Sequence, residues 1–199
     1  MNIIGPGSEW FWAMAQFVVV VVTLVGLYRQ LRQSNAANAV QRMEAFQGEW
    51  NSPRLIYARL AVAIWRKHTT SAEPSPEAQV PLAWLCGFFE NLSDLHLAGY
   101  LDWREIEVTW GAQLALWWQA LPDTIATARV ETLDAYSGFE LLAKRALAES
   151  AKRGDNWVVT PEQLPAALDV QIRRNRTRLR LLRDLETGAI LDDPLVAAG

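Results

Sequence analysis

The stretch WFWAMAQFVVVVVTLVGLY, residues 10–28, contains no charged side chain. At a rise of about 1.5 Å per residue, a helix of this length spans about 28 Å, close to the thickness of the hydrocarbon core of a bilayer. Trp10 and Trp12 lie at one end and Tyr28 at the other, as in the aromatic belts of membrane-spanning helices. The valine run leaves no polar face, so the sequence predicts a transmembrane helix rather than a core helix of a soluble domain.

The charges on either side of this segment predict its orientation. Glu9 precedes it, whereas Arg29 and Arg32 follow it. Because lysine and arginine gather on the cytoplasmic side, we expect residues 1–9 outside the membrane and the large C-terminal part in the cytoplasm. A secretory signal peptide carries positive charge before its apolar run, so we interpret residues 10–28 as an uncleaved anchor.

The composition fits one globular domain of ordinary size beside this anchor. The chain has 199 residues, a formal net charge of −3 and one cysteine, Cys86. This charge is too small to imply a partner, and the apolar content argues against disorder of the whole chain. A lone cysteine cannot form an internal disulfide, which fits a reducing compartment.

Helical patterning continues beyond the anchor. We expect a juxtamembrane helix over residues 29–52, because Val40, Met43, Phe46 and Trp50 recur at helical spacing. Ser52 followed by Pro53 is a helix-start signal, and it predicts a second helix that ends near residue 67. After a polar, proline-containing loop, a third helix should begin between residues 76 and 82 and end at Gly99.

The second half of the chain also reads as helical. Asp102 and Glu105 form a capping-box pattern that starts a fourth helix. Pro122 should end it and open a fifth helix that runs to about residue 152, with a bend at Gly138. Thr160 should start a last helix that reaches about Glu186, before a loose tail. The apolar stripe of the fourth helix is Trp103, Ile106, Trp110, Leu114, Trp117 and Leu121.

The predicted fold class is therefore all-α: an N-terminal transmembrane helix followed by a cytosolic bundle of about five helices. We place the bundle at residues 53–152. Residues 153–199 then form a basic C-terminal helix and tail.

Glu90 is a carboxylate within the apolar stretch of the third helix. On a helical wheel it lies away from the leucine stripe, on a face with Ala83, Gly87 and Asp94, whose small residues would admit another helix. Two explanations remain open. Either this face is partly solvated, or an arginine from a neighbouring helix reaches Glu90.

Two arginines are candidates for that contact. Arg59 lies near the apolar side of the second helix. Arg129 shares one face of the expected fifth helix with Leu133, Tyr136 and Glu140. A half-buried pair of this kind would orient the helices more than it would stabilise them.

Four segments of the chain resemble a known family. They are WNSPRLIYAR (50–59), FFENLSDLHLAGYLD (88–102), WWQALPDTIATAR (117–129) and YSGFELLA (136–143). They are similar to segments of a family of small bacterial single-span membrane proteins with a cytosolic helical domain of unknown function. The resemblance implies an all-helical fold, a bacterial inner-membrane location and a structural charge network of Arg59, Glu90, Arg129 and Glu140. It implies no activity, and it does not cover the chain after Arg153.

No catalytic or metal-binding pattern stands out, and we expect no cofactor. Glu90, Asp94 and His96 form the best metal cluster, but His96 points away from the other two on a helix. The sequence contains neither a glycine-rich phosphate loop nor a nucleophile elbow. An enzyme built on Glu90 and Glu140 is the least favoured interpretation.

The last helix is basic and amphipathic. Leu168, Ile172, Leu179 and Leu182 mark its apolar stripe. Its cations are Arg173, Arg174, Arg176, Arg178, Arg180 and Arg183. These arginines are candidates for contact with lipid or with nucleic acid. Alternatively they form a solvated surface paired with acidic residues elsewhere, or a binding site for another protein.

The favoured function is a membrane-anchored interaction or adaptor protein without enzymatic activity. Its expected partner is a protein, and self-association is possible. A membrane-tethered protein that binds nucleic acid through the last helix is the alternative.

Overall fold

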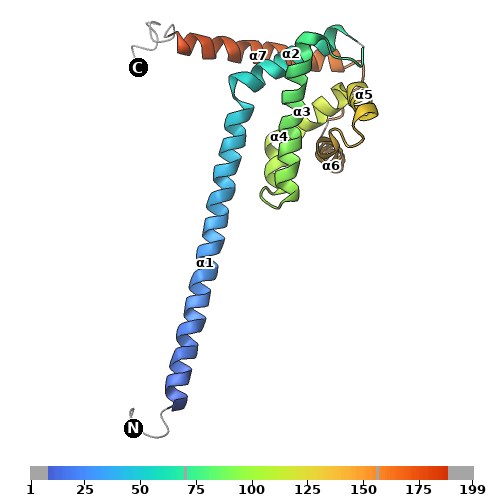
Figure 1. Ribbon diagram of the computed structural model, residues 1–199. Coiled ribbons are helices and arrows are strands. Elements are labelled where there is room, and N and C mark those ends of the chain that lie inside the picture. Colours follow the sequence, from blue (N-terminus) through green and yellow to red (C-terminus); the bar gives the residue numbers. More distant parts are fainter. Residues whose placement is uncertain (1–8, 70, 156, 188–199) are drawn as a thin grey trace. The chain divides into compact units, whose positions relative to one another are not determined.

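The computed structural model describes residues 9–69, 71–155 and 157–187, and for residues 9 and 31–39 it describes the backbone alone. In this part of the chain every regular element is a helix, which confirms the all-α fold (Figure 1). The helices are α1 (Glu9–Trp50), α2 (Pro53–His68), α3 (Pro76–Leu97), α4 (Trp103–Ala120), α5 (Pro122–Glu131), α6 (Ser137–Arg153) and α7 (Leu164–Glu186).

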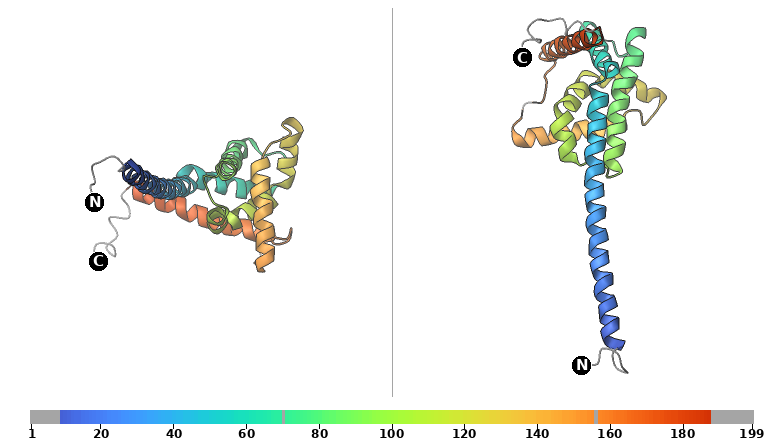
Figure 2. Two further views of the ribbon diagram at one scale, coloured as in Figure 1. Left: turned by 90° about the horizontal axis from the view of Figure 1, so that it is seen from below. Right: turned by 90° about the vertical axis from the view of Figure 1, so that its left-hand side faces the viewer.

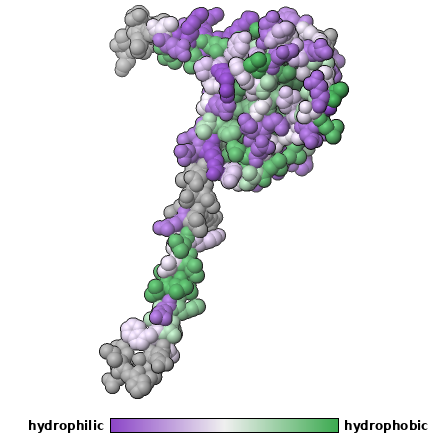
Figure 3. Space-filling model, viewed as in Figure 1, coloured by the Kyte–Doolittle hydropathy of each residue, from purple (hydrophilic) through white to green (hydrophobic). Residues whose placement is uncertain are grey.

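The chain divides into two compact units, Met1–Ala45 and Phe46–Gly199. In its described part the first unit consists of α1 alone. Its segment Trp10–Gln30 has a mean hydropathy of 2.1, and none of this apolar window is buried. Figure 3 shows it as a run of hydrophobic surface. By length and composition this helix can cross a membrane, as predicted.

The second unit begins with the end of α1, because the last turns of this helix carry core residues. The ring of Phe46 lies 5.6 Å from Phe88 and 6.5 Å from Trp110, and Trp50 lies 4.9 Å from Phe88. The helical continuation to Trp50 is thus confirmed. The compact unit begins at Phe46, before the expected boundary at residue 53.

The helix starts inside this unit follow the capping signals in the sequence. The Ser52 hydroxyl accepts a hydrogen bond from the backbone N–H of Leu55, and Pro53 occupies the first turn of α2. At α4, Asp102 and Glu105 form the predicted capping box. These caps satisfy backbone N–H groups that have no partner within the helix.

Aromatic side chains fill the core of the second unit. All six residues of the predicted α4 stripe are buried. Phe89 of α3 stacks on Phe139 of α6 with ring centroids 4.6 Å apart, and Trp118 meets the edge of Phe139 at 5.5 Å. Such ring pairs add about 0.5–1.5 kcal/mol each beyond the burial of their area. They hold α3, α4 and α6 together.

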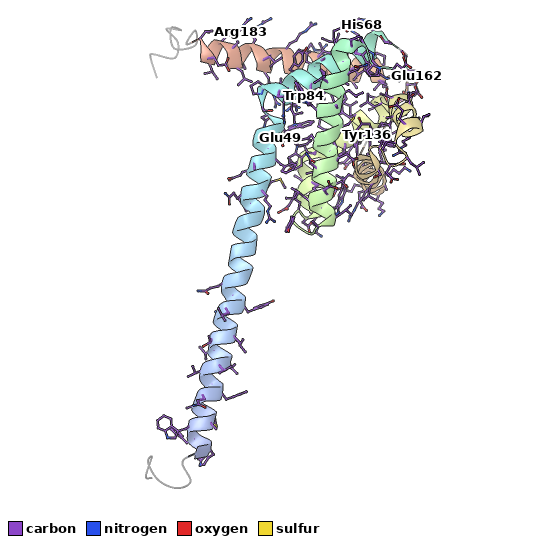
Figure 4. All side chains as sticks on the ribbon, viewed as in Figure 1. Glu49, His68, Trp84, Tyr136, Glu162 and Arg183 are labelled. Atoms are coloured by element: carbon purple, nitrogen blue, oxygen red, sulfur yellow. The ribbon has the colours of Figure 1, made fainter. Side chains whose placement is uncertain are left out.

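The expected single helix over residues 122–152 is wrong. The helix stops at Glu131 and resumes at Ser137, so α5 and α6 are separate elements. Tyr136 in the connection has a φ of 60°, a left-handed conformation that costs a non-glycine residue about 1–2 kcal/mol. Figure 4 labels this residue at the connection.

The chain between α6 and α7 crosses α4. The Gln119 amide donates to the carbonyl of Trp157 at 3.0 Å and accepts from the backbone N–H of Val159 at 2.8 Å. The Trp157 ring lies against Gly111, where an added Cβ would come within 2.6 Å of the ring. Residues 157–159 are therefore fixed in a non-helical conformation by side chains of α4.

The last helix begins slightly later than predicted. Residues around Thr160 form a turn in which the N–H groups of Gln163 and Leu164 both bond to its carbonyl, and α7 starts at Leu164. This helix packs along α2, and both views of Figure 2 show the two side by side. It thus belongs to the bundle rather than to a separate C-terminal region. The predicted loose tail lies outside the described residues.

Candidate functional site

The packing of α7 on the bundle orients its arginines. Leu168, Gln171, Ile172 and Asn175 are buried, whereas Leu179 and Leu182 of the predicted stripe are half-buried. An ion pair between Lys67 of α2 and Asp169 joins the two helices, with 2.6 Å between Nζ and Oδ1. The face of α7 that packs on the bundle is therefore fixed, and its arginines lie on the two flanks of that face.

Four arginines on one flank form a surface that we call the outer arginine row. It consists of Arg173, Arg176, Arg180 and Arg183, which recur at spacings of three and four residues. All four are exposed. Figure 4 shows Arg183 near the C-terminal end of α7, where hydrophilic surface is extensive in Figure 3.

The outer arginine row has little acidic compensation from the chain. Within the described residues, the only carboxylate in ion-pair range of the row is that of Asp184, 3.9 Å from Nε of Arg183. Besides Asp184, the carboxylate of Asp169 interacts electrostatically with the row. A hydrogen bond from Lys67, and the charges of Lys67 and Arg173, lower the pKa of this carboxyl. A row in which cations outnumber the nearby carboxylates attracts an anionic partner and speeds its association.

Arg59 is placed apart from the other members of the expected charge network. Its side chain is 2% exposed, and it donates to the carbonyls of Leu55 at 3.1 Å and Trp50 at 2.8 Å. The guanidinium also lies 4.0 Å from the centroid of the Trp50 ring. Arg59 thus supplies a donor to a carbonyl at the C-terminal end of α1.

Glu90 has backbone partners rather than an arginine. Its Oε1 accepts from the N–H of Phe139 at 2.6 Å, and its Oε2 accepts from the N–H of Gly138 at 3.4 Å. These N–H groups belong to the first turn of α6, where the helix dipole favours a negative charge. The expectation of an arginine at Glu90 is wrong, because a helix N-terminus supplies the donors.

The small residues of the Glu90 face are not what admits another helix, contrary to the prediction, because nothing lies within 4 Å of a Cβ added at Gly87 and Ala83 is exposed. At Gly138 of α6, an added Cβ would lie 2.8 Å from Cβ of Ser93 and 3.0 Å from Oε2 of Glu90. Glycine at this position therefore allows α6 to approach α3 closely enough for the Glu90 hydrogen bonds.

Arg129 and Glu140 are paired, with 2.5 Å between Nη2 and Oε2. Lys144 also contacts Glu140 at 2.5 Å, and Arg129 donates to the carbonyl of Ala135 at 3.0 Å. In one continuous helix, two residues eleven positions apart are separated by about 16 Å along the axis, too far for contact. The break between α5 and α6 brings the pair together, so the shared helical face that suggested it is not its cause.

The carboxylates of this region do not form an acid–base site. Hydrogen bonds from Lys144 and Arg129 lower the pKa of Glu140 and keep it ionised. A general acid near neutral pH requires the opposite shift. Both oxygens of Glu90 accept backbone hydrogen bonds, which indicates a structural role.

The metal cluster considered from the sequence is not assembled. Nδ1 of His96 lies 3.0 Å from the carbonyl of Leu101, and Nε2 lies 3.1 Å from Arg145. Within the described residues, no group of three histidine, cysteine or acidic side chains is placed to hold a metal. Cys86 is buried, and burial raises the pKa of its thiol, so it lacks the exposure of a reactive cysteine.

Sequence reasoning missed several polar residues where α7 packs on the bundle. Gln171 and Asn175 are buried, and together with Gln113 they line a cavity that also contains Arg59, Arg174 and Arg178. Their spacing could have predicted their burial, because Gln171 and Asn175 lie four residues apart and continue the buried stripe from Leu168.

Comparison with known proteins adds no relative: no protein-family model, curated protein or solved structure matches this chain.

Proposed function

We propose that the chain is a single-pass, membrane-anchored interaction protein whose helical domain binds an acidic protein partner through the outer arginine row of α7. The observation that carries this proposal is the exposure of four arginines on one flank, with Asp184 as the only carboxylate in ion-pair range among the described residues. Their alignment on a helix that is packed against α2 presents them as one rigid basic strip.

The anchor in this proposal is Trp10–Gln30. Its valine side chains are between 40% and 65% exposed over residues 18–22, and in water such a surface would be costly. The proposed orientation places the bundle in the cytoplasm of a bacterium, because Arg29 and Arg32 follow the span. The side chain of Arg32 lies outside the described residues.

The orientation has its own test. Protease added outside intact spheroplasts should spare the chain after Arg29, and permeabilised spheroplasts provide the control for cleavage. Digestion of the bundle in intact spheroplasts would reverse the proposed orientation.

A protein partner agrees better than nucleic acid with the rest of α7. Val170 is 51% exposed and lies three residues before Arg173, so it provides apolar contact area beside the outer arginine row. In the described part of α7 there is no aromatic side chain on which a base can stack. The chain as a whole carries a net charge of −3, unlike the strongly basic domains that bind nucleic acid backbones.

Affinity purification after mild crosslinking in cells tests the proposal when protein and nucleic acid are both quantified. Wild type should retain a stoichiometric acidic protein. The variant Arg176→Glu with Arg180→Glu should lose it. A matched variant, Arg104→Glu with Lys152→Glu, reverses two exposed charges elsewhere and should keep it.

Two results would replace this proposal. Enriched nucleic acid, with binding that weakens steeply as salt rises, would favour the tethered nucleic-acid-binding alternative. Equal loss of the partner in both charge-reversed variants would show that α7 is not the binding surface.

A further inference from the structure

We propose that a cavity enclosed by the end of α1, α2, α4 and α7 binds a phosphate group through Arg59, Arg174 and Arg178. The cavity has a volume of about 160 Å³. It lies on the opposite flank of α7 from the outer arginine row, and this inference does not depend on the proposed protein partner.

The cavity collects positive charge without an acidic counterpart for its arginines. In the described part of the chain, no carboxylate lies within ion-pair range of Arg59, Arg174 or Arg178. Burial, and then the charges of Arg178 and Arg174, lower the pKa of Arg59 to about 9. An oxyanion between the three guanidinium groups would relieve this repulsion and restore the solvation that Arg59 has lost.

Donors of these arginines remain for a ligand. The hydrogen bonds of Arg59 to Leu55 and Trp50 use Nε and Nη2 and leave Nη1. Arg178 donates from Nη1 to the amide oxygen of Asn51 at 3.2 Å, a neutral acceptor. A guanidinium binds phosphate through two parallel N–H donors. Arg174 and Arg178 can therefore each donate two hydrogen bonds to two oxygens of a phosphate group.

Buried amides supply a second, independent sign of an occupant. Asn175 is 1% exposed, and its Nδ2 has no hydrogen-bond partner. The buried Oε1 of Gln113 also lacks a partner. Folded proteins rarely leave such atoms unsatisfied. A phosphate oxygen would accept from Asn175, and a phosphate hydroxyl would donate to Gln113.

Among the described residues, the one carboxylate that lines the cavity already has an arginine partner. Glu107 accepts a hydrogen bond from Nη1 of Arg153, and Nε of the same arginine lies 2.7 Å from Oδ2 of Asp155. The cavity therefore keeps an excess of positive charge. A phosphate monoester carries between one and two negative charges at neutral pH. It therefore balances the charge of three arginines better than a ligand with a single carboxylate would.

Two sources supply this chemistry: a soluble phosphate or phosphate monoester, and the phosphate headgroup of a membrane lipid. The probes are inorganic phosphate and nanodiscs of phosphatidylcholine with or without phosphatidic acid. Isothermal titration calorimetry on the full chain in detergent should show saturable binding of inorganic phosphate, with chloride holding the ionic strength constant. If the natural ligand is a soluble phosphate or phosphate monoester, the titration with inorganic phosphate should give this saturable binding heat. Binding only to discs that contain phosphatidic acid identifies the lipid source, and it supports the same cavity.

Matched variants assign the binding to the cavity. Arg174→Gln with Arg178→Gln should weaken phosphate binding at least tenfold. Arg176→Gln with Arg180→Gln removes the same charge from the other flank of α7, and its affinity should stay within twofold of wild type. Arg178→Lys keeps the charge but loses the two-donor geometry, so it should weaken binding without unfolding the protein, as circular dichroism would verify.

The proposal is overturned if neither probe binds. It is also overturned if the two double variants lose affinity equally, because that result assigns binding to diffuse surface charge.

Discussion

The carboxylate of Glu90 on α3 accepts a 2.6 Å hydrogen bond from the backbone N–H of Phe139 in the first turn of α6. The relationship explains a charged residue beside the apolar stripe of α3. It also explains the restart of the helix after Tyr136, since α6 begins where an external carboxylate satisfies its first N–H groups.

Replacement of Glu90 by Ala should lower the free energy of unfolding by about 1–3 kcal/mol, because it leaves helix N–H groups without an acceptor. Glu90→Gln keeps one oxygen and should cost less. Urea denaturation measures both. Asp94→Asn, one turn further along the same helix at an exposed residue, is the control and should change stability little. Normal stability of Glu90→Ala together with a lost cellular activity would instead favour a catalytic role.

Gly138→Ala should destabilise the bundle by about 1–3 kcal/mol, because its new Cβ overlaps Ser93. Gly87→Ala on α3 is the matched control. Nothing lies within 4 Å of its added Cβ, so it should be neutral or slightly stabilising. Thermal melting compares the two. In the Gly138→Ala background, Ser93→Gly should restore part of the loss, and the absence of any rescue would contradict the close-approach explanation.

The ion pairs of Glu140 with Lys144 and Arg129 predict a pH-dependent contribution to stability. The pKa of Glu140 is lowered from 4.5, so its contribution is present above the unfolded pKa and is lost as the pH falls through the folded value. Glu140→Gln should therefore be less stable than wild type at pH 7, by less than about 1 kcal/mol for these partly exposed pairs. The two unfolding curves should converge well below pH 4.5. A difference that persists in acid would mean that charge is not the cause.

The sequence predicted those parts of the fold that depend on local signals. Ser52 with Pro53, and Asp102 with Glu105, located the starts of α2 and α4, because caps act within one turn. The first turn of α6 bonds to Glu90, which lies on α3 far away in sequence, and no local pattern reports such a contact.

The candidate sites were only partly predictable for the same reason. The periodicity of α7 placed its arginines on a helix, but it did not separate the outer arginine row from Arg174 and Arg178. That separation depends on which face packs against α2. Arg59 could be recognised as inward-facing, whereas its cavity partners come from α7, more than one hundred residues later.

Alkaline carbonate extraction tests the anchor. The full chain should stay in the membrane pellet, because the apolar window Trp10–Gln30 is long enough to span the hydrocarbon core. A variant that lacks these residues should move to the supernatant while its bundle keeps a cooperative melt, since the compact unit begins at Phe46. Release of the full chain by carbonate would contradict the anchor.

Site-specific photo-crosslinking in living cells tests the central claim most directly, with the crosslinking amino acid in place of Arg180 or of Val130. Both positions are exposed, but only the first lies on the outer arginine row. We predict one discrete protein adduct from position 180 and none from position 130. The adduct should disappear when Arg173 and Arg176 are changed to Glu. Identical adducts from both positions, or adducts of position 180 with lipid or nucleic acid alone, would contradict a protein partner at α7.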